Sequence, residues 1–445
     1  MKYYLISGEP SGDLHGSHLI RAIRAEDPAA EFRAWGGDLM AEAGATIVKH
    51  YRELAFMGVV QIVKNLPTIL RNERFCREDI AAFQPDRLVL IDYSGFNLRI
   101  AKWARPAGYD ISYYISPQVW ASRSGRVEQI KTNVDRMLVI LPFEEAWYAE
   151  RGVQATFVGH PLLDVVKEAE DLARARDARD VEKPGIPPEE NGLNSNTSNP
   201  SNVSPLPRRG AGGEGTSNDG NQESNIAYRI SHIKQGDGLR SADESAPTSR
   251  LGRRAKTIAL LPGSRKQEIS VGLPLMLAAA SKFPEHEYVI AGAPAQNPAF
   301  YEHIIASCGR APKNLRVVMN DTYGLLQTAH AAVVTSGTAT LETALFGVPQ
   351  VVVYKGNWLA YRIARWMVGS RIKYISLVNL VMDAPVVPEL IQADFNPENL
   401  AAHLQKTIAG PVRDQQLSDL ERLRERLGSG GAAGRAARAI VGAVA

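Results

Sequence analysis

The stretch AAVVTSGTATLETALFGVPQVVVY, residues 331–354, has the pattern of a strand, a turn, a helix and a second strand. The apolar runs AAVVT and QVVVY flank small and hydroxyl residues, which lead into the helix-like ATLETALF and stop at Gly347 and Pro349. Continuous rather than alternating hydrophobicity indicates strands buried on both faces, as in a parallel sheet covered by helices. The stretch therefore predicts one unit of a doubly wound α/β domain.

The same alternation of strand-like and helix-like segments occurs in both halves of the chain. Further strand-like runs are TIALLP, EYVIAG and LRVVM in the second half, and KYYLIS, LVLID, ISYYIS, RMLVIL and ATFVG in the first. A chain of 445 residues is too long for one ordinary core. We therefore expect two doubly wound domains, residues 1–168 and 256–425, followed by a helical tail over 426–445.

The composition changes abruptly between the two halves. Residues 182–255 include PPEENGLNSNTSNPSNVSPLPRRGAGGEG, and Tyr228 is the only aromatic residue among them. Such a segment cannot bury enough apolar area to offset the entropy lost on ordering. We expect a disordered insertion that the surface tolerates, in preference to a functional tail.

Bulk composition narrows the function classes. A net charge of +3 is too small to indicate a nucleic-acid partner, but it suits anionic small molecules or an anionic membrane surface. Cys76 and Cys308 form no CxxC pair, so we expect a reducing cytoplasm and neither disulfides nor structural zinc. We expect no signal peptide and no membrane span. The chain lacks both a GxGxxG after its first strand and a GxxxxGK[ST], which disfavours dinucleotide-binding and P-loop proteins.

The helix start in the opening stretch has the chemistry of an anion site. Ser336, Gly337 and Thr338 are small enough to let backbone N–H groups approach an anion, which the helix dipole also favours. Glu342, one turn further on, can hydrogen-bond a hydroxyl pair such as that of a ribose. On this stretch alone, an ordinary capped helix with a solvent-facing glutamate explains the pattern equally well.

A second small-residue turn changes that balance. The run TIALL ends in Pro262, Gly263, Ser264 and Arg265, and an arginine guanidinium can form two parallel hydrogen bonds to a diphosphate. Two anion-competent turns in one domain favour a site for a nucleoside diphosphate over a surface turn with an unrelated arginine.

The first domain carries candidate acid–base residues in two turns. The turn SGEPSGD holds Glu9, Ser11 and Asp13, although a helix-capping loop would have the same residues. The run LVLID ends in Asp92, and a carboxylate at the end of a buried strand is costly unless it is used. A general base is the functional interpretation of Asp92, and a turn or cap aspartate is the alternative.

Two further stretches add candidate residues near the substrate. YYISPQVWASRSGRV ends a strand with a mixed aromatic and basic loop that includes Gln118. FVGHPLLD places His160 at the expected domain junction, where a structural histidine is the more common role. Residues 54–77 and 357–374 mix apolar or aromatic residues with cations, as do helices that lie on anionic membranes, although core packing explains part of each.

Together these segments resemble the lipid-A-disaccharide synthase family. SGEPSGD, FMG, FNLR, YYISPQVWA, LPFE, FVGHPLLD, LLPGSRKQEI, TSGTATLETAL, YISLVN and VPELIQ occur in the family's order and cover nearly all of both domains. The resemblance implies the GT-B fold, in which two Rossmann-like domains face each other across a cleft. It also implies inverting transfer from UDP-2,3-diacylglucosamine to 2,3-diacylglucosamine 1-phosphate, with release of UDP and with neither a cofactor nor a metal.

The resemblance further implies a peripheral enzyme on the cytoplasmic face of the inner membrane, and it leaves the oligomeric state open, a homodimer included. The family's essential aspartate falls on Asp92, and its other functional residues fall on Glu9, Arg265, Glu342 and Asn379. Two positions depart from the family pattern: Gln61 stands where an acid is common, and Ser122 where a tryptophan is common.

Three alternatives remain at the level of sequence. A transferase that adds GlcNAc to a lipid-linked peptidoglycan precursor shares the glycine-rich helix but lacks SGEPSGD. A UDP-sugar 2-epimerase shares the fold but needs no lipid, which leaves the amphipathic stretches unexplained. A non-catalytic lipid or nucleotide-binding module would not require both Asp92 and Glu9.

Overall fold

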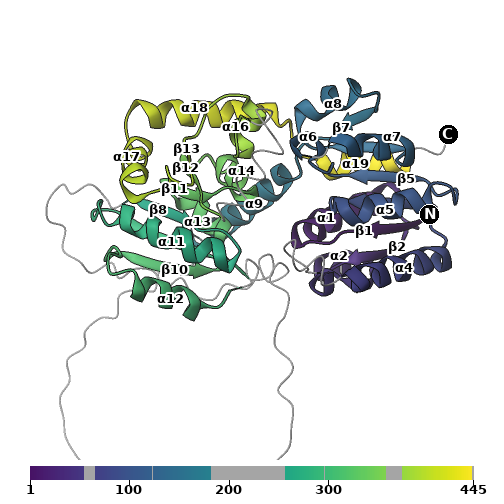
Figure 1. Cartoon of the computed structure of the whole chain (residues 1–445), viewed down its shortest axis with the longest axis horizontal. Helices are drawn as coiled ribbons and strands as arrows, with labels where there is room; N and C mark the ends of the chain where they lie inside the picture. Colours follow the sequence, from purple (N-terminus) through teal and green to yellow (C-terminus); the bar gives the residue numbers. More distant parts are fainter. Residues whose placement is uncertain (55–65, 123, 182–255, 295, 357–372, 443–445) are drawn as a thin grey trace, which may run out of the picture.

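The computed structural model describes residues 1–54, 66–122, 124–181, 256–294, 296–356 and 373–442 (Figure 1). These residues form two α/β lobes, each built on one parallel sheet. Gln61, the expected insertion over 182–255 and most of the stretch 357–374 lie outside the described residues. Among the described helices, none combines the length and the apolar character needed to cross a membrane.

The N-terminal lobe contains a seven-stranded sheet in the order β3-β2-β1-β4-β5-β6-β7. Every strand pairing in it is parallel. The strands are β1 (Lys2–Ile6), β2 (Glu31–Gly36), β3 (Thr46–His50), β4 (Arg87–Ile91), β5 (Ile111–Tyr114), β6 (Arg136–Val139) and β7 (Ala155–Phe157). The helical segments between them are α1 (Pro10–Glu26), α2 (Asp38–Glu42), η1 (Tyr51–Leu54), α4 (Leu66–Phe83), α5 (Ser94–Ala104), α6 (Val119–Ser122), η2 (Ser124–Arg126), α7 (Val127–Asn133) and α8 (Pro142–Ala149).

The C-terminal lobe contains a six-stranded sheet in the order β10-β9-β8-β11-β12-β13, again entirely parallel. Its strands are β8 (Thr257–Leu261), β9 (Glu287–Gly292), β10 (Leu315–Met319), β11 (Ala331–Thr335), β12 (Gln350–Tyr354) and β13 (Glu389–Ile391). Its helices are α11 (Lys266–Ala280), α12 (Pro298–Ser307), α13 (Thr322–Thr328), α14 (Thr338–Leu345), α16 (Leu377–Met382), α17 (Pro397–Ile408) and α18 (Pro411–Arg426).

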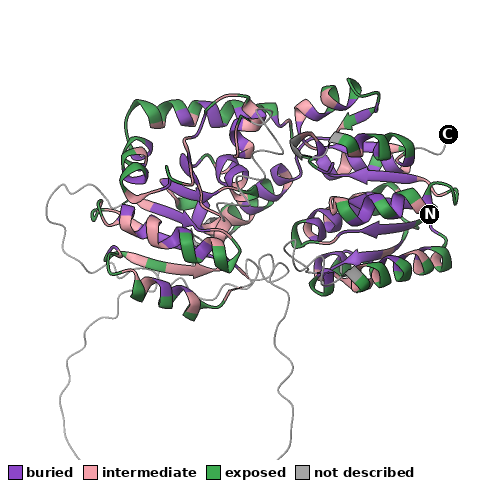
Figure 2. Ribbon diagram, viewed as in Figure 1, coloured by how far each residue is buried: buried purple, intermediate pink, exposed green. Residues whose placement is uncertain are grey.

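Every stretch predicted to be a strand is one, and the predicted doubly wound α/β architecture is confirmed. Most of the continuous apolar runs are central strands, whose side chains are buried on both faces (Figure 2), whereas LRVVM and ATFVG form the edge strands β10 and β7. The sequence analysis missed β2, β3 and β13. The sequences EFRAWG and TIVKH mix polar with apolar residues, β3 and β13 lie at sheet edges, and β13 has only three residues, so none gives a continuous apolar run.

Two helices join the lobes. α9 (Leu162–Val181) follows the N-terminal sheet but packs against α13 and α14 of the C-terminal lobe. α19 (Ala432–Val441) ends the C-terminal half but packs against α1, where its alanines and Ile440 enter the core of the N-terminal lobe. The tail expected over 426–445 is therefore largely this helix, returned to the first lobe (Figure 1).

The two crossings are hydrogen-bonded to each other and to the N-terminal lobe. The Asp164 carboxylate accepts a hydrogen bond from the Gly431 amide, which joins the start of α9 to the start of α19. The Arg435 guanidinium donates to the carbonyl oxygens of Val158, Ser429 and Gly430. These contacts hold together the two chain segments that pass between the lobes.

Candidate active site

The predicted site turns lie at the same place in both sheets. In each sheet the chain order reverses beside the first strand, because β1 lies between β2 and β4, and β8 lies between β9 and β11. Ligands of open α/β sheets bind beyond the carboxyl ends of the strands at such reversal points. Glu9 and Asp92 follow β1 and β4, while Arg265 and Gly337 follow β8 and β11.

Glu9 precedes the first turn of α1 and is solvent-exposed. It occupies the N-cap position with an extended backbone, but its side chain does not cap the helix. Within the described residues its carboxylate makes no hydrogen bond or ion pair that would fix it. Ser11, in the same helical turn, is also exposed. Both side chains are therefore accessible to a ligand at the carboxyl edge of the sheet.

Asp92 is half-buried, and its backbone is in the left-handed region, with φ of 44°. The pKa of its carboxyl group is raised to about 6, chiefly by burial and in addition by the charge of Glu9, while a hydrogen bond from the Tyr93 amide acts in the opposite direction. A carboxyl group with a pKa near neutrality can take and release a proton under ordinary conditions. This is the protonation behaviour that a general base requires.

The turn after β8 presents an arginine to solvent. Gly263 has a φ of 101°, a left-handed conformation that favours glycine, and the exposed Ser264 and Arg265 follow it. Arg265 is the N-cap residue of α11, and its Nη1 lies 3.0 Å from Glu268 Oε1. Because the Arg265 side chain is 65% exposed, an incoming diphosphate can reach it at little cost in broken contacts.

The turn after β11 begins α14. Gly337 is its N-cap residue without a side-chain cap, and both Gly337 and Thr338 are exposed, so the amides of the first helical turn face outward. Ser336 Oγ donates a 3.0 Å hydrogen bond to the Ile375 carbonyl, which ties this turn to the segment before α16. Glu342, one turn into α14, is partly buried. The two anion-competent turns of the C-terminal lobe thus follow neighbouring strands.

Comparison with known proteins fits this geometry. The model of the lipid-A-disaccharide synthetase family matches residues 3–188 and 239–439. A lipid-A-disaccharide synthase of Syntrophus aciditrophicus is 35% identical over 97% of this chain and 95% of its own length. That of Myxococcus xanthus is 32% identical over 98% of this chain and 96% of its own length. The chain belongs to the lipid-A-disaccharide synthase family.

Membership of the lipid-A-disaccharide synthase family makes the chain a glycosyltransferase of lipid A biosynthesis. The segment that the family model leaves unmatched, residues 189–238, falls within the expected insertion.

Solved structures with a similar fold are distant in sequence. The UDP-GlcNAc 2-epimerase of Neisseria meningitidis, bound to UDP-GlcNAc, aligns with a TM-score of 0.53 at 10% identity over 99% of both chains. The glycotransferase of kitacinnamycin aligns with a TM-score of 0.55 at 16% identity over 99% of this chain and 98% of its own. Together with the two parallel sheets, these likenesses show that this chain has the two-lobed GT-B fold predicted from the sequence.

Asn379, which the family resemblance places among the functional residues, is buried and fully committed to its own lobe. Its Nδ2 donates to Val387 O at 2.8 Å and to Glu389 Oε1 at 2.9 Å, while its Oδ1 accepts from Val387 N at 2.9 Å. The Glu389 carboxylate also accepts hydrogen bonds from the amides of Ile375 and Ser376. Asn379 therefore shapes the segment that Ser336 contacts, and its amide has no donor left for a ligand.

Asp13 is also occupied by the fold. Its Oδ1 accepts from the amides of Gly37 at 2.7 Å and Met40 at 3.1 Å, and its Oδ2 from that of Leu39 at 3.2 Å. Asp13 thus satisfies the free amides at the start of α2 from the neighbouring helix α1. The sequence left open a capping role at the start of its own helix, but Glu9 is the N-cap residue of α1, and Asp13 lies within α1 and caps α2 instead.

Gln118 and His160 differ in their exposure. Gln118 is exposed in the loop after β5, beside Trp120, whose Nε1 donates a 3.2 Å hydrogen bond to the buried Glu144. His160 is buried before α9, its Nδ1 accepts from the Leu162 amide at 3.2 Å, and burial lowers its pKa to about 3. His160 is therefore neutral and has a structural contact at the lobe junction, whereas Gln118 is available to a substrate.

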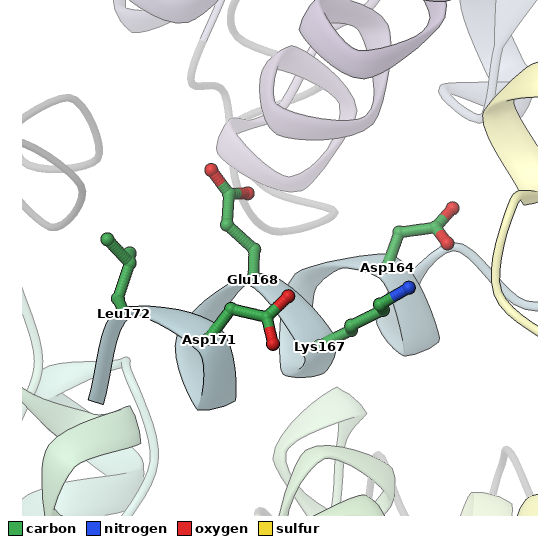
Figure 3. A pocket seen from close by; sticks show the side chains of 5 residues that line it. All are labelled: Asp164, Lys167, Glu168, Asp171 and Leu172. Atoms are coloured by element: carbon green, nitrogen blue, oxygen red, sulfur yellow. The ribbon is translucent and has the colours of Figure 1, made fainter. Parts of the chain in front are cut away.

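A pocket of 460 Å³ lies along α9, and no residue of the four site turns lines it (Figure 3). Its lining residues all come from that helix: Asp164, Lys167, Glu168, Asp171 and Leu172. Three carboxylates and one ammonium would repel a diphosphate or a sugar phosphate, so this pocket is not the substrate site. The described residues contain no group of histidine, cysteine and acidic side chains that could hold a metal ion.

The sequence analysis left unassigned three residues that support the site. Asn97 and Tyr113 hydrogen-bond the Asp92 carbonyl, and Glu389 organises the segment before α16. Asn97 and Glu389 lie in FNLR and VPELIQ, two of the segments that carry the family resemblance. That placement was a usable signal, although only the tertiary contacts reveal what the side chains do.

Proposed function

We propose that the chain transfers 2,3-diacylglucosamine from UDP-2,3-diacylglucosamine to 2,3-diacylglucosamine 1-phosphate, with inversion at the anomeric carbon. The observation that carries this proposal is Asp92, a partly buried carboxyl group with a pKa raised to about 6. It lies at the reversal point of the N-terminal sheet, whereas the two anion-competent turns belong to the C-terminal lobe. Family membership supplies the class of substrate, which is a lipid A precursor. A structural neighbour bound to UDP-GlcNAc supports a UDP-linked amino sugar as donor.

In the N-terminal lobe, Asp92 acts as general base. It takes the proton of the acceptor hydroxyl while that oxygen forms a bond to the anomeric carbon of the donor. The bond between this carbon and the diphosphate oxygen breaks, and UDP leaves with the electron pair. A positioned base contributes roughly 10²–10⁴ in rate. Glu9, whose charge already acts on Asp92, keeps the proton affinity of the base high. Ser11 and Gln118, both exposed at this edge, contact the acceptor.

In the C-terminal lobe, the two turns after β8 and β11 bind the UDP. The Arg265 guanidinium and the amides at Gly337 and Thr338 stabilise the charge that develops on the departing diphosphate. The Gly263–Ser264 turn permits close backbone approach, and Glu342 hydrogen-bonds the ribose hydroxyls. Asn379 acts indirectly, through the segment that anchors Ser336.

The acceptor and donor carry acyl chains, so we propose that the enzyme works on the cytoplasmic surface of the inner membrane. The stretches 54–77 and 357–374 combine apolar or aromatic residues with cations, the composition of segments that lie on anionic lipid.

The decisive assay measures disaccharide and UDP formation by the purified chain from the two defined acylated sugars. We expect turnover by the wild-type chain and almost none by Asp92→Asn, with UDP affinity unchanged in calorimetry. If Asp92→Asn retains more than about a tenth of the wild-type activity, the role of Asp92 as base is refuted. The loss would then be smaller than the roughly 10²–10⁴-fold that a general base contributes.

A further inference from the structure

The Asp92 carbonyl is held by two side chains from different elements. Tyr113 Oη, on β5, donates a 2.5 Å hydrogen bond to it, and Asn97 Nδ2, on α5, donates to it at 2.9 Å. Tyr113 and Asn97 are both completely buried. A carbonyl at the edge of a sheet would otherwise turn toward water, so this arrangement fixes the peptide that follows Asp92.

Asn97 also joins the strand that precedes Glu9 to the one that precedes Asp92. Its Nδ2 lies 3.3 Å from Ile6 O, at the end of β1, and 3.2 Å from Ile91 O, at the end of β4. One amide group therefore spans the reversal point of the sheet, and it fixes the two strand ends relative to each other.

The backbone at this point is in an unfavourable conformation. Asp92 has a φ of 44° and Tyr93 a φ of 45°, a pair of left-handed residues without glycine. Such conformations persist only where surrounding contacts enforce them, and they concentrate at functional sites. The Tyr93 ring stacks on Phe96 and lies so close to Gly8 that a Cβ there would fall 2.5 Å from the ring. The left-handed turn thus packs directly against the loop that carries Glu9.

We propose that Asn97 and Tyr113 are positioning residues for the glycosyl transfer, holding the left-handed Asp92 backbone in the conformation that presents its carboxylate to the acceptor. Neither side chain reaches the substrate, and both act through Asp92. The inference rests on the proposed role of Asp92 as base, and it adds the groups that make that role geometrically possible.

The test compares two adjacent tyrosines in the full-length chain. Tyr113→Phe removes the hydroxyl that bonds Asp92. Tyr114→Phe removes the hydroxyl of an equally buried residue on the opposite face of β5, and within the described residues that hydroxyl has no hydrogen-bond partner. We expect Tyr113→Phe to lower kcat about 10- to 100-fold, since a displacement of about 1 Å at a reacting group has effects of this size. The KM values and the UDP affinity should stay within about twofold, and Tyr114→Phe should match wild type.

The pH profile of kcat separates positioning from a general loss of structure. The titratable or charged groups around Asp92 are Glu9 after β1, the adjacent Tyr93, Tyr113 on β5 and Arg126 in η2. If the carbonyl is released, the carboxylate moves toward solvent and away from Glu9. We therefore expect the acid limb of the Tyr113→Phe profile to move to lower pH.

Asn97→Ala provides a second variant with the same expected loss in kcat. If Tyr113→Phe has the kinetics of Tyr114→Phe, or if kcat, KM and UDP affinity decline together, the positioning role is wrong while the role of Asp92 can stand. If Asp92→Asn remains active, both proposals fail. If thermal unfolding shows that neither Tyr113→Phe nor Asn97→Ala folds, the two residues serve stability alone and the inference is overturned.

Discussion

The buried Asn379 is paired with the partly buried Glu389, and Asn379 Nδ2 lies 2.9 Å from Glu389 Oε1. The same carboxylate accepts from Ile375 N and Ser376 N, each at 2.9 Å, so the pair determines the path of the chain just before α16. Ser336, at the start of the α14 turn, bonds that same segment. Asn379 thereby helps to shape the segment that holds the turn after β11, which we propose binds the nucleotide.

We therefore predict that Asn379→Ala lowers the free energy of unfolding by about 1–3 kcal/mol, because it leaves the buried N–H and C=O of Val387 without a partner. Asn399→Ala, on an exposed turn of α17, is the control and should change stability by less than about 0.5 kcal/mol. Denaturant unfolding measures both. Unchanged stability together with lost UDP binding would instead indicate a direct ligand contact by Asn379.

Glu9→Gln should move the acid limb of the kcat profile to lower pH. The charge of Glu9 contributes to raising the Asp92 pKa to about 6, and removing that charge allows Asp92 to ionise at lower pH. In wild type, activity should rise with pH through about 6, because the base works in its ionised form. An acid limb that stays in place in Glu9→Gln would show that the two carboxylates are not coupled.

The raised Asp92 pKa also has a consequence for stability. A carboxyl group whose pKa is raised on folding contributes stability that is fully present below its unfolded pKa and is lost as pH rises through its folded pKa of about 6. Relative to wild type, Asp92→Asn should therefore be more stable at pH 8 than at pH 4. At pH 8 its free energy of unfolding should equal that of wild type or exceed it by up to about 3 kcal/mol. Thermal unfolding at the two pH values checks this, and a destabilised variant at pH 8 would contradict it.

Arg265→Ala and Glu342→Ala should each weaken UDP binding, by about tenfold or more for the arginine, because a charge-assisted hydrogen bond to the diphosphate is lost. Arg316→Ala is a matched control: Arg316 is likewise a half-exposed arginine with an acidic partner, Glu287, but it lies on the edge strand β10. Calorimetry with UDP gives the affinities. If the UDP affinities of Arg265→Ala, Glu342→Ala and Arg316→Ala are equal, these two turns do not bind the nucleotide.

Deletion of residues 186–250 should leave folding and turnover nearly unchanged, because the composition of this segment cannot support a core and loop-closure entropy changes slowly with length. The thermal midpoint and kcat of the deleted chain are compared with those of wild type. A deleted chain that folds but does not turn over would reveal a role for the segment in the reaction.

Membrane binding should be reversible and partly salt-sensitive. Arg362→Glu with Arg365→Glu should reduce sedimentation with anionic vesicles, since each basic residue near such a surface contributes roughly 1 kcal/mol. Trp358→Ala should lower the fraction that resists high salt, which reflects apolar insertion. Failure of the wild-type chain to sediment with these vesicles even at low salt would exclude the surface role of the stretch 357–374.

The sequence by itself determined the architecture and the candidate turns. Continuous apolar runs such as TIALL and QVVVY, short and bounded by turn residues, indicate strands buried on both faces, and small residues after such runs predict anion-competent helix starts. Asp92, Glu9, Arg265 and Gly337 could all be selected because strand ends can be recognised locally.

Only the tertiary structure decided which strand ends meet and what each side chain does there. The pairing of β1 with β4 brings Glu9 beside Asp92 across some eighty residues of sequence, and local periodicity carries no information about strand order. Hydrogen-bond partners are equally non-local. Asp13 accepts from the start of α2, and Asn379 donates to Glu389. The Asp92 carbonyl accepts from Asn97 and Tyr113. A polar residue becomes a ligand or a structural contact according to the groups that folding places around it.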